Sequence, residues 1–196
     1  MNYQKKLDTE LEKIRDTMPK LLLHSCCAPC SSYVIEYLSK HFNITVFYYN
    51  PNIQPKEEYE KRKAEQKRLL TLTDYGNSIE FFDHDYDGDI YETAVKGMES
   101  EPEGGIRCTT CFEIRLNKTA EIAGEIYADY FTTTLTVSPH KNAPLINEIG
   151  SAAGAHCGVK YLLSDFKKKS GYLRSIELAK KHELYRQNYC GCSYSK

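Results

Sequence analysis

Short apolar runs along this chain are separated by longer segments in which apolar residues recur at helical spacing. The runs predict five buried strands, at residues 20–25, 44–49, 79–84, 130–135 and 161–163. The helical spacing predicts helices at residues 31–41, 56–72, 89–98, 108–127, 143–153 and 172–182. Strands that alternate with helices form parallel βαβ units. We therefore expect an α/β fold, a doubly wound parallel sheet with helices on both faces.

The first twenty residues are highly charged and contain an amphipathic helix that ends near Met18 and Pro19. We interpret residues 1–20 as an N-terminal helical extension. Residues 21–196 show no internal repeat and no linker, so we expect a single α/β domain that binds metal and carries the catalytic site. A chain of 196 residues is long enough to bury one sizeable core.

The composition is that of an ordinary soluble globular protein, with 41% hydrophobic and 27% charged residues. No apolar run approaches the roughly 18 residues that cross a bilayer, so we expect no membrane association. The N-terminal segment carries charges of both signs and lacks an apolar signal core, which argues against export. We therefore expect a cytoplasmic protein in a reducing environment, where thiols remain available to metal.

Charge is unevenly distributed along the chain. The net charge is −1, which by itself argues against a nucleic-acid partner. Residues 160–196, however, hold nine basic and three acidic side chains, whereas residues 80–103 are strongly acidic. A basic face beside an acidic one suits a protein that docks a polyanion on one side. A solvated lysine-rich helix explains the same pattern equally well.

Seven of the eight cysteines fall into three short motifs. In a reducing compartment, grouped thiols are more plausible as metal ligands than as disulfide halves. The eighth, Cys157, we interpret as a small buried apolar residue. The seven candidate ligands are Cys26, Cys27, Cys30, Cys108, Cys111, Cys190 and Cys192.

The first motif follows the first predicted strand and precedes the next predicted helix. Ligands of a doubly wound sheet bind beyond the carboxyl ends of its strands, and a helix N-terminus favours a thiolate. Because adjacent side chains of an extended backbone diverge, we expect Cys26 and Cys27 to serve two neighbouring centres. Cys108 and Cys111, three residues apart, would share one face of a helix.

Seven thiols exceed the four that a tetrahedral zinc ion or a cubane iron–sulfur cluster needs. The natural partition is four plus three, which gives one complete cluster and one further metal with an open position, as in a catalytic site. Cys27 and Cys30 alone would also suit a redox disulfide, as in thioredoxin-like proteins. That fold needs none of the other grouped thiols.

Five longer motifs follow one another along the chain. They are HSCCAPCSS from His24, FYYNPNIQPKEEYEKRKAEQ from Phe47, RCTTCFEIRL from Arg107, TTTLTVSPHKN from Thr132 and DFKKKSGYLRSIELAKKHELYRQNYCGCSYS from Asp165. Together they closely resemble the QueH-type epoxyqueuosine reductases, from about Leu21 to the C-terminus.

The resemblance implies a specific reaction, removal of the epoxide oxygen of epoxyqueuosine at the wobble position of tRNA. The expected substrate is a tRNA with a GUN-type anticodon, and an external electron donor supplies two electrons. The resemblance also implies a 4Fe–4S cluster beside a mononuclear metal, iron or zinc, and no cobalamin. The fold it implies is Rossmann-like and nucleotide-hydrolase-like. We expect some members of the family to carry a carboxylate where this chain has Cys30, so the second metal has a softer ligand set here.

On this basis we assign the thiols to two centres. The cluster would be held by Cys27, Cys108, Cys111 and one of Cys190 and Cys192, and the second metal by Cys26, Cys30 and the remaining thiol.

The C-terminal segment interleaves basic and aromatic residues, which track phosphates and stack on unpaired bases. A wobble nucleotide lies in a single-stranded loop and can enter a pocket at modest cost. Tyr59 and Arg62, with Gln66, share one face of the 56–72 helix and either frame this pocket or form an ordinary solvated face. The other candidates for tRNA binding are Lys167, Lys168, Lys169, Tyr172, Arg174, Arg186 and Tyr189.

The proton donor and the class of protein stay open at this point. His24, Asp83, His84, His140 and Tyr189 lie near motifs or strand ends, and none ranks above the others. A zinc-stabilised RNA-binding module without redox activity would hold its metal in closed four-thiolate sites. A thiol–disulfide oxidoreductase would need no metal.

Overall fold

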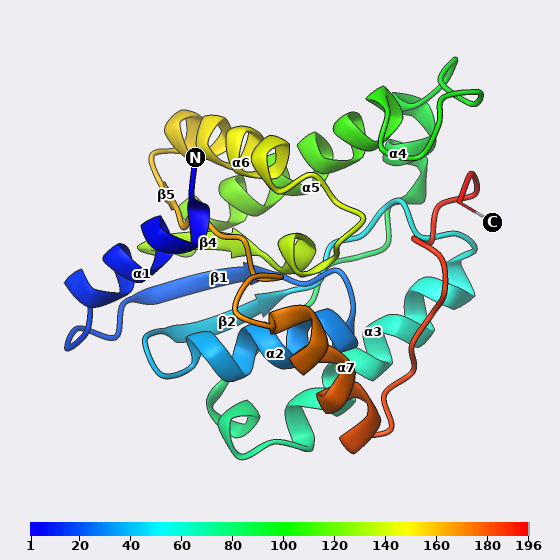
Figure 1. Ribbon diagram of the computed structural model, residues 1–196. Coiled ribbons are helices and arrows are strands. Elements are labelled where there is room, and N and C mark those ends of the chain that lie inside the picture. The colour runs from blue at the N-terminus through cyan, green and yellow to red at the C-terminus, as the bar shows by residue number, and fades with distance from the viewer. Residues whose placement is uncertain (196) are drawn as a thin grey trace.

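An all-parallel sheet of five strands forms the centre of the computed structural model, which describes residues 1–195. The strand order is β3-β2-β1-β4-β5, so β1 is central (Figure 1). Lys20 of β1 pairs with Asn43 of β2, and Leu21 pairs with Tyr130 of β4. The strands are β1 (Lys20–His24), β2 (Asn43–Phe47), β3 (Glu80–Phe82), β4 (Tyr130–Thr133) and β5 (Lys160–Tyr161).

Helices cover both faces of this sheet (Figure 1). On one face α2 (Ala28–Leu38) packs against α7 (Gly171–Lys181), and on the other α5 (Ile106–Glu125) packs against α6 (Ala143–Cys157). The α/β prediction of a doubly wound, Rossmann-like parallel sheet is confirmed. The remaining elements are α1 (Tyr3–Lys13), α3 (Lys56–Thr71), α4 (Gly88–Ala94) and two 3₁₀ turns, Asp74–Ser78 and Thr134–Val137.

Successive residues of β1 pack against opposite layers of the fold. Leu21 and Leu23 are buried in one core with Val34 of α2, whereas Leu22 is buried in a second core with Leu116 of α5. A strand with both faces covered has no solvent side, so β1 is an unbroken apolar run rather than an alternating one. The carboxyl ends of β1 and β4, between which the strand order reverses, are the position where such sheets bind ligands.

Helix α1 shares the core of the sheet. Leu7 and Leu11 are buried beside Leu21 and Leu38. The helix ends at Lys13, earlier than predicted. The division into an extension of residues 1–20 and a domain of residues 21–196 stays a prediction, and the packing shows that the two parts share one core.

The end of β4 differs from the sequence prediction. The strand stops at Thr133, whose hydroxyl accepts a hydrogen bond from the Leu135 N–H (3.2 Å) and turns the chain into a 3₁₀ turn. The predicted strand at 130–135 is therefore too long, and both 3₁₀ turns went unpredicted. None of the helices within residues 1–195 is long and apolar enough to cross a membrane.

Replacing Leu7 by Ala tests the packing of α1. The side chain is fully buried, so its truncation should lower the free energy of unfolding by about 2–5 kcal/mol. Lys6→Ala, on the exposed side of the same helix, is the control and should change it by less than about 0.5 kcal/mol. Urea denaturation measures both. Equally small losses would show that α1 does not pack into the core.

Candidate metal centre

The first cysteine motif lies at the carboxyl end of the central strand. The chain bends at Cys26, and Cys27 is the extended residue that precedes the first turn of α2. The sulfur atoms of Cys26, Cys27 and Cys30 all lie within 4.8 Å of one another, and those of Cys26 and Cys27 are 3.8 Å apart. The expectation that Cys26 and Cys27 diverge is therefore wrong, because the bend interrupts the alternation of an extended strand.

Hydrogen bonds link the three thiols and change their pKa values. Hydrogen bonds from Cys27 and Cys30 hold the pKa of Cys26 well below its usual value. The Thr134 hydroxyl after β4 adds a further hydrogen bond to the Cys26 sulfur (3.2 Å). The same sharing, together with burial, raises the pKa of Cys30 and raises that of Cys27 to about 12. A metal ion that displaced these protons would find three sulfur ligands already gathered.

The other two motifs meet at the start of α5. Cys111 and Cys192 are buried in the same side-chain cluster. Cys108 lies one turn before Cys111, and its sulfur accepts a hydrogen bond from the Gly104 N–H (3.2 Å). A hydrogen bond from Cys192 lowers the pKa of Cys190 well below its usual value. The second and third motifs thus lie together although about eighty residues separate them.

A cavity of about 660 Å³ joins the first motif to the third. Cys26, Cys27, Cys30 and Cys190 line it. The other three candidate ligands are not among the described residues of its wall. Cys157, expected to be a small buried residue, is half-buried at the end of α6.

Two cations face the thiols, of which Arg115 is buried and Lys141 is half-buried. Arg115 is 2% exposed and donates to His24 Nε2 (3.3 Å) and to Cys111 Sγ (3.8 Å). The amine of Lys141 lies 3.6 Å from Cys190 Sγ. Burial by itself lowers the pKa of Lys141, but the attraction of Cys190 outweighs it and raises the pKa to about 12. Buried positive charges require negative partners, so these residues fit an anionic metal–thiolate centre.

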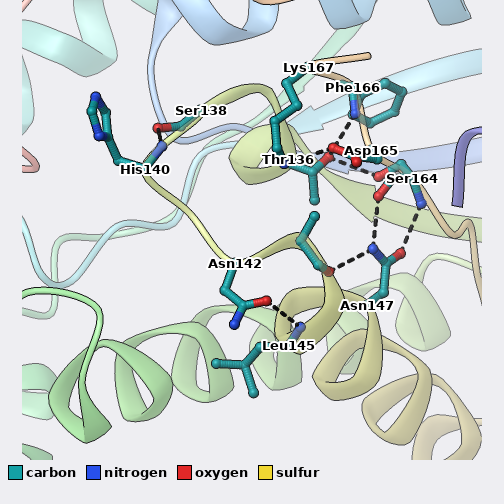
Figure 2. Close-up of polar contacts among 11 residues, drawn as sticks. Thr136, Ser138, His140, Asn142, Leu145, Asn147, Ser164, Asp165, Phe166 and Lys167 are labelled. Atoms are coloured by element: carbon teal, nitrogen blue, oxygen red, sulfur yellow. Dashed lines mark hydrogen bonds and ion pairs between the residues drawn. The ribbon is translucent and has the colours of Figure 1, made fainter. Parts of the chain in front are cut away.

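The loop that carries Lys141 is fixed at both ends (Figure 2). At its start the His140 N–H donates to the Ser138 hydroxyl (3.3 Å). At its end the Asn142 side chain accepts from the Leu145 N–H (3.2 Å) and caps α6. The loop therefore has a defined path between the 3₁₀ turn and the helix.

Asn147 extends this bracing to the chain after β5 (Figure 2). Its side chain bonds both the N–H and the carbonyl of Ser164, each at 2.8 Å. The Ser164 hydroxyl lies 3.1 Å from the Thr136 hydroxyl, which also accepts from the Phe166 N–H (3.3 Å). These buried hydrogen bonds join the segments after β4 and β5 and support the wall that presents Lys141.

A family model described as Epoxyqueuosine reductase QueH matches residues 21–196. The chain belongs to this family. A protein of that name from Streptococcus pyogenes serotype M1 is 46% identical over 95% of this chain and 72% of its own length. Its counterpart from Staphylococcus aureus strain Mu50 is 43% identical over all of this chain, including residues 1–20, and 84% of its own length. A Thermotoga maritima protein of the same name is 36% identical over 91% of each chain.

Three of the residues expected to bind tRNA in a QueH family member line the cavity, namely Tyr172, Arg186 and Tyr189. The Arg186 guanidinium lies 5.8 Å from the centroid of the Tyr172 ring and donates to its hydroxyl (3.2 Å). Four more of the candidates for tRNA binding are basic residues in or just before α7. Lys168 is exposed, while Lys167, Lys169 and Arg174 pair with Asp165, Asp8 and Glu36.

Tyr59 and Arg62, expected to frame a tRNA pocket, are buried, as is Gln66. This face of α3 packs against the end of β2 and against the C-terminal segment. The Tyr59 ring lies 5.2 Å from that of Tyr48, and Arg62 donates to the Cys190 carbonyl (3.0 Å). The alternative of an ordinary solvated face is therefore wrong, and the expected tRNA contacts of Tyr59 and Arg62 stay a prediction. In this QueH family member the face supports the third cysteine motif.

The candidate proton donors differ in whether they line the cavity. His140 and Tyr189 line it. His24 lies in the core, where burial and a neighbouring guanidinium lower its pKa to about 3 and keep the ring neutral. Asp83 pairs with two lysines of α3, and the His84 ring packs against aromatic rings of the β2 segment.

Sequence reasoning missed Arg115 and Lys141, although both lie in motifs that carried the resemblance to the QueH family. For Arg115 a signal existed, because a residue four positions after Cys111 shares its helix face. For Lys141 none did, since its approach to Cys190 depends on how distant segments pack.

The buried His24 makes stability depend on pH. Its pKa in the folded chain is about 3, against 6.5 normally. Between these values the unfolded chain binds the extra proton, so stability is fully present above pH 6.5 and falls as pH falls, by up to about 1.4 kcal/mol per unit. In metal-free protein, His24→Gln should flatten this slope, measured by denaturation at several pH values. The exposed control His156→Gln should retain it. Identical slopes for His24→Gln and the parent chain would contradict the account.

Proposed function

We propose that this chain removes the epoxide oxygen of epoxyqueuosine at the wobble position of a tRNA with a GUN anticodon, giving queuosine. The observation that carries the proposal is the convergence of three cysteine motifs beside one cavity in a member of the QueH family. The relatives' names identify the reaction, and the gathered thiols provide the place for its metal chemistry. The reaction belongs in the cytoplasm, where tRNA and an external electron donor are both available.

The seven grouped thiols would hold a 4Fe–4S cluster and an adjacent mononuclear metal, iron or zinc, with no cobalamin. The sulfur atoms of Cys26, Cys27 and Cys30, within 4.8 Å of one another, suit one metal ion with its fourth position open. Four thiols remain, the number that holds a cubane cluster, and they are Cys108, Cys111, Cys190 and Cys192. Compared with the assignment made on the sequence, this partition moves Cys27 from the cluster to the single metal. It also moves one of Cys190 and Cys192 from the single metal to the cluster.

When bound, these groups would polarise the epoxide oxygen and deliver electrons from the external donor. The chain's own residues have three tasks. Arg115 and Lys141 balance the negative charge of the thiolates from inside the fold. Tyr172 and Arg186 offer a ring and a cation to a nucleotide that enters the cavity. The deoxygenation consumes two protons and releases water, and His140 lies in the cavity wall where a proton is needed.

A direct assay decides between this function and an RNA-binding module. The anaerobically prepared protein is incubated with tRNA that contains epoxyqueuosine and with a chemical reductant, and the nucleosides are analysed by mass spectrometry. Loss of one oxygen atom from the modified nucleoside is the expected result. Binding of this tRNA without any loss of oxygen, under conditions in which a known epoxyqueuosine reductase converts it, would favour the zinc-stabilised RNA-binding module.

Arg186 tests the predicted docking of tRNA. Arg186→Gln removes an exposed cation that stacks on Tyr172 at the cavity. We expect weaker binding of tRNA and a salt dependence of the binding constant whose slope falls by about one, as for a lost phosphate contact. Arg15→Gln, which removes an exposed arginine just after α1, is the matched control. Equal binding by the two variants would exclude Arg186 from the tRNA interface.

A further inference from the structure

Three buried side-chain donors near the first cysteine motif have no hydrogen-bond partner among the described residues. They are the Tyr48 hydroxyl, Arg62 Nη2 and Gln66 Nε2. Tyr48 and Gln66 are completely buried, and Arg62 is 2% exposed. A buried donor without an acceptor costs about 1–3 kcal/mol, so such groups are rare in folded proteins. Three of them lie around the first cysteine motif, so its sulfur atoms are the acceptors to consider.

The position of Tyr48 follows from the sheet. The Ser25 N–H donates to the Phe47 carbonyl (2.9 Å), so Tyr48 lies beside the turn that begins the first cysteine motif. Its side chain packs with Tyr59 of α3, on the face opposite to that of Phe47. The start of α2, directly after Cys27, packs against the same helix α3, because Ala28 is buried with Leu69. Burial, and next the nearby Cys27 thiol, raise the pKa of the Tyr48 hydroxyl well above its usual value.

Gln66 reaches the same motif from α3. Its carbonyl oxygen accepts a hydrogen bond from the Ser25 hydroxyl (2.7 Å), which lies 2.6 Å from the Ser31 hydroxyl. These two serines directly flank the segment from Cys26 to Cys30. The amide nitrogen of Gln66 has no acceptor for its hydrogen atoms among the described residues.

Arg62 lies one helical turn before Gln66. Its Nε donates to Glu58 (2.7 Å) and its Nη1 to the Cys190 carbonyl (3.0 Å), which leaves Nη2 unpaired. Burial lowers the pKa of Arg62, but Glu58 and, less strongly, Cys27 and Tyr48 raise it above its usual value. Cys27 is therefore the sulfur that Tyr48 and Arg62 have in common.

We infer that Tyr48, together with Arg62 and Gln66, is a positioning residue whose hydroxyl donates a hydrogen bond to the Cys27 sulfur when that sulfur binds metal. The inference rests on the proposed metal centre and adds residues that are not ligands. A metal-bound thiolate keeps lone pairs that accept hydrogen bonds. Such bonds orient the ligand and lower its electron donation to the metal. The Tyr48 hydroxyl would then be satisfied only in the metal-loaded protein.

Tyr48→Phe deletes the hydroxyl alone and gives a test with two independent readouts. In metal-free protein the thermal midpoint should stay the same or rise, because no hydrogen bond is lost. In protein loaded anaerobically with Co(II), the sulfur-to-cobalt charge-transfer absorption should shift to longer wavelength, because the thiolate donates more strongly. Tyr161→Phe is the matched control. Its hydroxyl is also buried without a hydrogen-bond partner, but it packs on Phe131 between β5 and α6, so its spectrum should equal that of the parent chain.

Three results would overturn the inference. The first is a Co(II) spectrum of Tyr48→Phe identical to that of the parent chain. The second is a large loss of stability in the metal-free variant, which would reveal a protein partner for the hydroxyl. The third is a parent chain that binds no Co(II) through sulfur, which would remove the metal centre as well. A parent chain that converts tRNA while Tyr48→Phe shows no spectral shift would overturn the inference alone and leave the proposed function standing.

Discussion

The burial of the Arg115 guanidinium among cysteine sulfurs is the constraint on which the site depends. Arginine keeps its charge at any accessible pH, and an unpaired charge in a protein interior costs several kcal/mol. Arg115 donates to Asn50 Oδ1 (2.6 Å), and the Asn50 amide donates to the Ser25 carbonyl (2.9 Å). One cation thus connects α5, the end of β2 and the β1–α2 turn. Its charge is balanced only if sulfur atoms such as that of Cys111 are negative, which metal binding ensures.

The C-terminal cysteines depend on a second set of contacts, made by the segment around α3. The Gln54 N–H donates to the Gly191 carbonyl (2.8 Å), and Arg62 donates to the carbonyl of Cys190 (3.0 Å). Gly191 has a positive φ of 121°, and a Cβ there would lie 2.9 Å from the Arg62 guanidinium. Only glycine combines this backbone conformation with so close an approach. Gly191 therefore allows the backbone between Cys190 and Cys192 to pack closely against Arg62. Cys190 lines the cavity.

The fold could be predicted from sequence because each strand is a local apolar run and each crossover has helical spacing. The metal site was harder to predict from sequence than the fold. The positions of the cysteines at the carboxyl edge followed from the fold class, but the direction of the Cys26 side chain depended on a local bend that apolar patterning does not encode. The spacing of Tyr59 and Arg62 correctly placed them on one helix face. Spacing alone could not show that this face is buried under Cys190, because that contact joins residues 128 positions apart.

The metal and sulfide content of the protein tests the central claim, that the three cysteine motifs hold a 4Fe–4S cluster and an adjacent metal. The protein is purified without oxygen, reconstituted with iron and sulfide, and analysed for iron, zinc and acid-labile sulfide per chain. Cys157→Ala, which removes the one cysteine outside the three motifs, is the control and should match the parent chain. About four sulfide ions and more than four metal ions per chain would agree with a cluster beside a single metal. Protein that holds zinc alone, with no sulfide even after reconstitution, would contradict the account.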